Sequence, residues 1–155
     1  MHIRSFQEAD REAIKNITAI CFEGVGIDYN IEQRYGVIHE MDWRSRKVRH
    51  IDADIAANAA GIFVAEEAGA VIGYVTTRID QASKIGSIPN LGVLPAHRGA
   101  GIGRQLIETA TAYAKAEGMA YLRIETLDQN PIGQYLYPSC GFEEIARQIH
   151  YIKPL

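Results

Sequence analysis

Residues 90–104 read NLGVLPAHRGAGIGR: an apolar strand pattern, a proline-marked turn, and three glycines two residues apart that lead into a helical pattern. A turn of this composition leaves several backbone N–H groups free at the N-terminus of a helix, where the helix dipole adds partial positive charge. Glycine also lets the backbone approach a ligand without a Cβ in the way. The stretch therefore predicts a binding site for a phosphate-bearing ligand.

The length and composition of the chain favour one ordinary globular domain covering residues 1–155. Hydrophobic residues make up 47% and charged residues 23%, which suits a packed core. The net charge of −3 argues against nucleic acid as the main partner. No apolar run approaches the roughly 20 residues of a membrane span, and the N-terminus shows no signal-peptide core, so we expect a cytoplasmic protein.

The cysteines and histidines do not indicate a metal site. Cys21 and Cys140 lie far apart, and neither belongs to a CxxC or a zinc-ligand spacing. The histidines are scattered and never fall four residues apart. We therefore expect no metal and two reduced thiols.

Periodicity along the chain predicts an α+β domain with helices packed on a largely antiparallel sheet. Strand patterns cover His2 to Ser5, Gly61 to Glu66, Val71 to Ile79, Ile85 to Val93, Tyr121 to Leu127 and Phe142 to Ile152. Helical patterns run from about Ala9 to about Phe22, loosely through residues 28 to 59, from Ile102 to a Gly118 C-cap, and from Asn130 to about Pro138.

Two features inside these segments bear on a site. Pro89 interrupts the fourth strand pattern just before the glycine turn, and a proline in a strand implies a bulge or an edge. Between residues 28 and 59, the basic cluster Arg44 to His50 is followed by Asp52 and Asp54. This segment is either a solvated helix face with balanced charge or one wall of a substrate pocket, and both alternatives stay open.

Two well-known phosphate-binding motifs match the glycine turn poorly. The P-loop pattern requires Lys and then Ser or Thr after its last glycine, where this chain has Arg104 and Gln105. The dinucleotide fingerprint requires GxGxxG after the first strand of a βαβ unit, whereas the spacing here is GxGxG after a run of strands. A nucleotide-binding protein is therefore a weak alternative. A plain structural turn without a ligand is a second weak alternative.

Two motifs resemble those of the GNAT-type N-acetyltransferases. Residues 98–103 match every fixed position of the signature R/Q-x-x-G-x-G/A, and residues 91–95 resemble the L-x-V-x-P run before it. Residues 130–142 resemble a second segment, N-x-x-A-x-x-L-Y-x-x-x-G-F, with Gly133 in place of the usual alanine. The two motifs occur in the family's order, and the close match covers about residues 85–142.

The resemblance implies a single GNAT-like domain with a mixed, mostly antiparallel sheet of six to seven strands and about four helices. The fourth and fifth strands would splay apart into a cleft for acetyl-CoA as co-substrate, with Pro89 at the bulge that opens it. The residues implied in binding are Leu91 and Val93 for the pantetheine arm, Arg98, Gly99, Ala100, Gly101, Gly103 and Arg104 for the pyrophosphate, and Asn130 for the CoA arm. Asn130 before a proline is also a good helix N-cap, and the two roles are compatible.

The implied reaction is acetyl transfer to a primary amine by direct attack in a ternary complex. The N–H of Val93 would bind the oxyanion. Tyr137 would be the acid for the departing thiolate, because its reference pKa of about 10 exceeds the 8.5 of a thiol. Many family members carry a glutamate base on the fourth strand, where this chain has Pro89 and Asn90. Glu125 is the replacement we favour, and an unperturbed carboxylate there would need burial or a water relay.

The acceptor is not defined by these motifs. The spacing of Glu125 and Tyr137 resembles that of acetyltransferases that modify ribosomal-protein N-termini, and a small amine or amino acid fits equally well. The missing fourth-strand carboxylate keeps a different class open, a non-catalytic acyl-CoA sensor on the same fold. Beyond the acceptor we expect neither nucleic acid nor membrane as partner, and a homodimer is left open.

Overall fold

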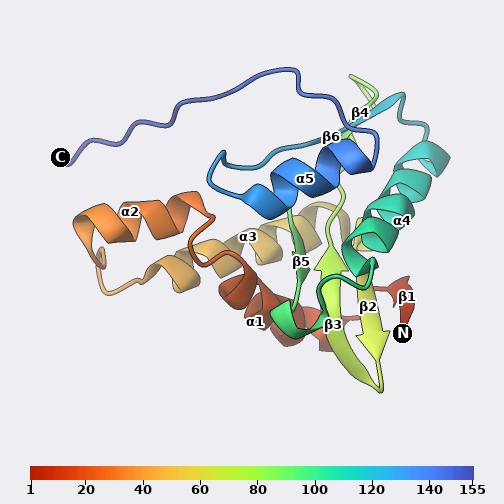
Figure 1. The fold of residues 1–155 in the computed structure, drawn as a ribbon, viewed down its shortest axis with the longest axis horizontal. Helices are drawn as coiled ribbons and strands as arrows, with labels where there is room; N and C mark the ends of the chain where they lie inside the picture. The colour runs from red at the N-terminus through yellow and green to blue at the C-terminus, as the bar shows by residue number, and fades with distance from the viewer.

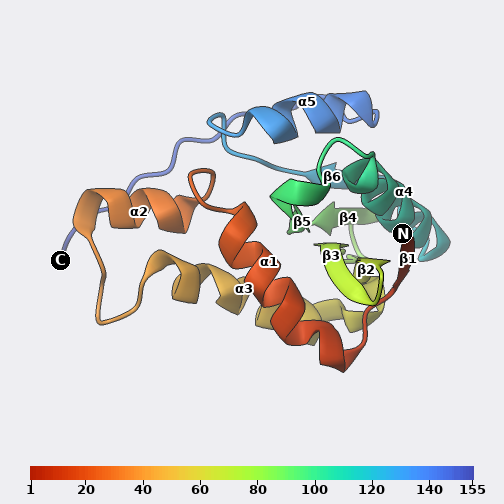
Figure 2. The same ribbon diagram turned by 60° about the horizontal axis from the view of Figure 1, so that its bottom comes forward.

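A computed structural model describes residues 1–155 and places helices on both faces of a mixed sheet (Figure 1, Figure 2). The strands are β1 (His2–Ser5), β2 (Phe63–Glu67), β3 (Ala70–Val75), β4 (Ile85–Ile88), β5 (Leu91–Val93) and β6 (Tyr121–Ile124). The α-helices are α1 (Arg11–Cys21), α2 (Ile27–Tyr35), α3 (Trp43–Asn58), α4 (Ile102–Ala116) and α5 (Pro131–Ser139). No helix combines the length and hydropathy that crossing a membrane requires.

The strands form a four-stranded sheet and a two-stranded sheet, and the pairing is mostly antiparallel, as the sequence predicts. Strands β1, β2, β3 and β5 pair in that order, every neighbour antiparallel, and β4 pairs with β6 in parallel. The β2–β3 hairpin turns at Ala68 and Gly69, whose φ values of 49° and 79° are both positive. Two positive φ values are typical of the type I′ turn, whose twist matches that of the flanking strands.

Pro89 divides the fourth strand pattern into β4 and β5, which confirms the predicted break. β4 pairs with β6 as far as the pair Ile88 and Ile124. After Pro89, which has no N–H to donate, β5 pairs with β3 alone. From this point on β5 and β6 do not pair with each other.

The two faces of the sheet carry separate apolar cores. Helices α1 and α3 cover one face through buried side chains, namely Ile14, Ile17, Ile51 and Ile55, which pack with Ile62, Val64 and Tyr74. Helix α4 covers the other face through Ile102, Leu106 and Ala110, which pack with Ala65, Ile72, Val75 and Ile88. Figure 2 shows α1 and α3 on one side of the strands and α4 with α5 on the other.

The prediction of a last strand from Phe142 to Ile152 is wrong. Residues 143–155 form no secondary structure and no backbone hydrogen bond, and they run past α5 toward the α2 end of the molecule, where the C-terminus lies (Figure 1). A strand forms only when its N–H and C=O groups find a neighbouring strand, and this segment reaches none. Its apolar side chains stay exposed, 89% at Ile145 and 89% at Tyr151.

Candidate functional site

The glycine turn presents free backbone donors at the start of α4. Gly99 and Gly101 adopt positive φ values of 84° and 79°, and Gly101 is the N-cap of the helix. The first helical bond runs from the Gln105 N–H to the Gly101 carbonyl, and the N–H groups of residues 99–104 donate to no acceptor in the chain. Adjacent free donors at the positive end of a helix dipole form an anion site.

The two arginines of the turn are exposed, and each is held by a backbone carbonyl. Arg98 Nε donates to the Val93 carbonyl at 3.0 Å. Arg104 donates to the Ser139 carbonyl at 2.8 Å and to Ser139 Oγ at 3.0 Å, so it joins α4 to the end of α5. At Gly103, an added Cβ would lie 3.2 Å from Leu136, which shows how closely α5 approaches α4. Both guanidinium charges add to the positive potential near the turn.

The edge of β5 that faces away from β3 has free backbone groups. The Thr76 N–H donates to the Asn90 carbonyl, and the Leu94 N–H donates to the Ile72 carbonyl. In an antiparallel pair the residues alternate, so Leu91 and Val93 turn their N–H and C=O groups to the open side. The Val93 carbonyl accepts from Cys21 Sγ and Arg98 Nε, so the N–H is the only backbone group of Val93 that has no partner at this edge.

A buried polar network lies behind the strand break. Asp54 of α3 is 2% exposed and accepts hydrogen bonds from Thr76 Oγ1 at 2.8 Å, Asn90 Nδ2 at 2.6 Å and Arg78 Nη2 at 2.6 Å. Lys47 Nζ donates to Asn90 Oδ1 at 2.7 Å. Asn90, which follows Pro89 directly, is therefore fixed between a carboxylate and an ammonium group.

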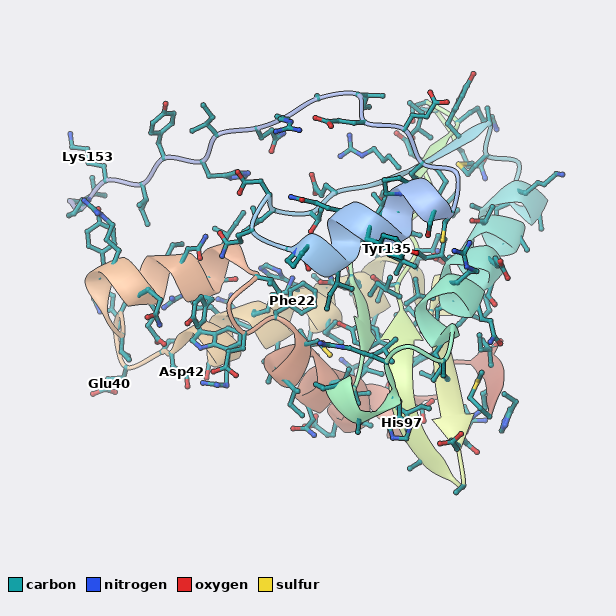
Figure 3. The ribbon with its side chains drawn as sticks, viewed as in Figure 1. Phe22, Glu40, Asp42, His97, Tyr135 and Lys153 are labelled. Atoms are coloured by element: carbon teal, nitrogen blue, oxygen red, sulfur yellow. The ribbon has the colours of Figure 1, made fainter.

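The basic cluster of α3 has one face in solvent and one face packed behind the strand break. Burial lowers the pKa of Lys47, whose Nζ lies 4.0 Å from the ring centroid of Phe22 at the end of α1 (Figure 3). Arg49 is exposed and has no ion-pair partner. The segment is thus solvated on one face and contributes to the strand break on the other.

Sequence reasoning did not identify Asp54 as part of this network. Asp54 lies between Ile51 and Ile55 on the buried face of α3. A carboxylate within an apolar helical stripe must find donors, because an unpaired buried charge is very costly. The position of Asp54 between two buried isoleucines is the sequence feature that could have identified it.

Tyr137 lies on α5 with its ring half-buried and 6.4 Å from the ring of Phe142. Its hydroxyl makes no hydrogen bond within the chain, and burial raises the pKa of Tyr137 to about 12. Tyr137 is therefore a protonated, unpartnered donor at neutral pH.

Asn130 is the N-cap of α5, as the sequence predicts. Its Oδ1 accepts from the Gly133 N–H at 3.4 Å, and its Nδ2 donates to Thr126 Oγ1 at 2.9 Å. Both ends of the side-chain amide are used inside the chain, so Asn130 fixes the point where the segment after β6 becomes helix.

Glu125 follows β6 directly and lines a hollow of about 190 Å³ with Arg78, Ser87, Pro89 and Arg123. Its carboxylate is exposed and makes no hydrogen bond or ion pair in the chain. A larger hollow of about 340 Å³ lies between α4 and the end of α5, and neither Glu125 nor Tyr137 lines it. Of these two hollows, the one at the strand break contains Glu125.

A family model described as "Acetyltransferase (GNAT) family" matches residues 22–142. The chain therefore belongs to the GNAT acetyltransferase family. This confirms the resemblance carried by the glycine turn and the second motif.

Relatives of the chain include two kinds of acetyltransferase. The mycothiol acetyltransferase of Thermobispora bispora is 30% identical over 97 residues, which cover 59% of this chain and 33% of that protein. The aminoglycoside N(6′)-acetyltransferase type 1 of Salmonella typhimurium is 27% identical over 106 residues, 64% of this chain and 73% of that protein. The chain spans less than half the length of the mycothiol acetyltransferases that it matches.

Solved structures share the fold. The PaiA N-acetyltransferase from Thermoplasma acidophilum, in complex with coenzyme A, matches with a TM-score of 0.73 at 19% identity, over 92% of this chain and 89% of that one. The aminoglycoside N-acetyltransferase AAC(6′)-Iy, in complex with CoA, matches with a TM-score of 0.67 at 20% identity, over 99% and 100%. The expected GNAT-like α+β fold is confirmed.

Proposed function

We propose that the chain is an acetyl-CoA-dependent N-acetyltransferase that acts on a primary amine in a ternary complex. One observation carries the proposal: the free N–H groups of residues 99–104 and the free edge of β5 lie on the two sides of one turn. The relatives are named as acetyltransferases, and one of them acts on aminoglycosides by its name, which supports an amine acceptor. These names do not favour a non-catalytic sensor.

The co-substrate fits this arrangement of backbone groups. Leu91, through its N–H and C=O groups, bonds the amides of the pantetheine arm as a neighbouring strand would, where β5 has lost its partner, and the free Val93 N–H lies further along the same edge, beside the thioester. The pyrophosphate accepts from the N–H groups of residues 99–104, which include Gly99, Ala100, Gly101 and Gly103. Arg98 and Arg104 add positive charge beside it. Asn130 supports the CoA arm by fixing the start of α5.

In the proposed reaction the amine nitrogen attacks the thioester carbonyl, the C–N bond forms and the C–S bond breaks. The Val93 N–H, free at the edge of β5, donates to the oxyanion of the tetrahedral intermediate. The Tyr137 hydroxyl donates to the departing sulfur. With the pKa of Tyr137 near 12, strong hydrogen bonding to the thiolate does more of this work than full proton transfer.

The amine must lose a proton before or during attack. We assign this proton to Glu125, directly or through a water, because its free carboxylate lines the hollow at the strand break. Asn90, which stands near the position of the family's base, is held by Asp54 and Lys47 and carries no acidic group. A base matters most for an amine such as lysine, which is almost wholly charged at pH 7.

An acceptor screen tests the proposal. The chain is incubated with acetyl-CoA and a panel of amines, amino acids and peptides, and both CoA release and acetylated product are measured. We expect both products in equal amounts with at least one acceptor. CoA release without acetylated amine would show hydrolysis, and no turnover with any acceptor would contradict the assignment.

A further inference from the structure

Two arginines and a serine form one row across three neighbouring segments of the sheet. Arg78 and Ser87 bridge through two backbone hydrogen bonds of 2.8 and 2.9 Å, and Ser87 is the register partner of Arg123 on β6. Register partners put their side chains on the same face, so the three point to one side of the sheet. Two strand spacings separate the arginine backbones by roughly 10 Å, which both long side chains can bridge.

This row lies on the face that α1 and α3 cover elsewhere in the domain. Ile88 and Ile124, the next residues on each strand, pack in the core beneath α4. Side chains alternate along a strand, so Ser87 and Arg123 face the opposite way. The row and Glu125 line the same hollow of about 190 Å³ at the strand break. The hollow is smaller than a site for a drug-sized ligand, which suits a small acceptor.

The two guanidinium groups have different surroundings. Arg78 is fixed by Asp54 through Nε at 3.0 Å and Nη2 at 2.6 Å, and its Nη1 makes no hydrogen bond. Arg123 is exposed and forms no hydrogen bond or ion pair in the chain. One positioned and one unpaired guanidinium, with a hydroxyl between them, match the planar oxygens of a carboxylate.

Glu125 lies two residues beyond Arg123 along the chain, at the end of the row nearest the strand break. A spacing of two residues corresponds to about 6.6 Å along a strand. An ammonium group beside Glu125 and a carboxylate beside the arginines could therefore belong to one small molecule, a few bonds apart. We propose that the acceptor is a small amine that carries a carboxylate, with its amine at Glu125 and its carboxylate at Arg78, Ser87 and Arg123.

This inference rests on the proposed acetyl transfer at the same strand break, and acceptors with and without the carboxylate separate the two. Each amino acid, with its amine one to four carbons from the carboxylate, is compared with its own carboxamide. CoA release gives kcat and KM for both members of a pair. The two amines of a pair differ in pKa, so kcat/KM is calculated on the concentration of unprotonated amine. We expect it to be about 10- to 100-fold higher for the carboxylate, the range of a charge-assisted hydrogen bond.

Arg123→Gln tests the residue that is free to contact the acceptor. We expect KM for carboxylate acceptors to rise about tenfold or more, with kcat nearly constant and little change for carboxamides. Arg49→Gln is the control: it removes the same charge from an exposed position on α3. It should change neither kcat nor KM for either kind of acceptor. A cooperative thermal transition shared by both variants shows that each is folded.

The outcomes distinguish this inference from the function on which it rests. Equal turnover of carboxylates and carboxamides, unchanged by Arg123→Gln, overturns carboxylate recognition and leaves acetyl transfer standing. Turnover only of amines that lack a carboxylate, including polycationic ones, likewise overturns carboxylate recognition and leaves acetyl transfer standing. No acetylated product from any amine overturns both.

Discussion

Arg78 and Asp54 form an ion pair in which Nη2 lies 2.6 Å from Oδ1, and the carboxylate of that pair is almost fully buried. The other oxygen of Asp54 accepts from Thr76 and Asn90. One carboxylate thus holds α3, the end of β3 and the residue after Pro89 in a single arrangement. The geometry of the strand break depends on this group.

Asp54→Asn should lower the free energy of unfolding by about 2–4 kcal/mol. This loss is small for a buried ion pair that loses one charge, because the Arg78 side chain is 43% exposed and can be hydrated. Asp52→Asn is the matched control on the same helix, since Asp52 is 42% exposed and pairs with Arg11 and Lys15 at the surface. It should cost less than about 1 kcal/mol. Urea unfolding of both variants checks this, and equal losses would show that Asp54 does not organise the break.

Gly101→Ala should weaken CoA binding about tenfold. Alanine at a φ of 79° costs about 1–2 kcal/mol, and relief of that strain turns the N–H groups of the turn away from the pyrophosphate. Gly118→Ala places alanine at a similar φ of 84° after the other end of α4. Calorimetric titration with CoA should show a loss of affinity for Gly101→Ala alone. An equal loss in both variants would mean that general strain, not the turn, lowers the affinity.

The pH dependence of kcat/KM should show no descending limb below about pH 10. Burial raises the pKa of Tyr137 to about 12, so the phenol keeps its proton well above neutral pH. The profile should instead rise with pH as the amine acceptor loses its proton. Initial rates from pH 6 to 10 with one acceptor test this. A descending limb near pH 8 or 9 that disappears in Tyr137→Phe would contradict the assigned environment.

The C-terminal segment, residues 143–155, should exchange its amide hydrogens as fast as an unfolded peptide. It has no backbone hydrogen bond, whereas β2 and β3 lie in the centre of the sheet and each is paired on both sides. Hydrogen exchange followed by mass spectrometry measures both regions in one experiment. Protection of residues 145–152 that grows with protein concentration would contradict this and would show that a second copy supplies the missing neighbour.

Much of the fold could be predicted because local patterns and tertiary structure agree. The break at Pro89 and the cap at Asn130 both follow from the local preferences of single residues. The last strand could not be predicted in this way, since alternation shows only that a segment can pair. Whether it pairs depends on the rest of the molecule.

The site residues also fall into two groups: those that local patterns predict and those that only tertiary structure brings together. The glycine turn and Tyr137 belong to motifs of contiguous residues, so spacing alone indicates them. The row of Arg78, Ser87 and Arg123 joins three separate segments through strand register, which a single sequence does not contain. Asp54 and Lys47 are likewise brought to Asn90 only by the packing of α3.

Turnover of Tyr137→Phe, compared with Tyr135→Phe, tests the central claim most directly. Tyr135 is on the same helix, 77% exposed, and serves as the matched control (Figure 3). With an acceptor from the screen, we expect kcat to fall about 10²- to 10⁴-fold in Tyr137→Phe while CoA affinity and Tyr135→Phe turnover stay unchanged. Full acetyl transfer by Tyr137→Phe, or no acetylated amine from the unaltered chain, would contradict the proposed mechanism.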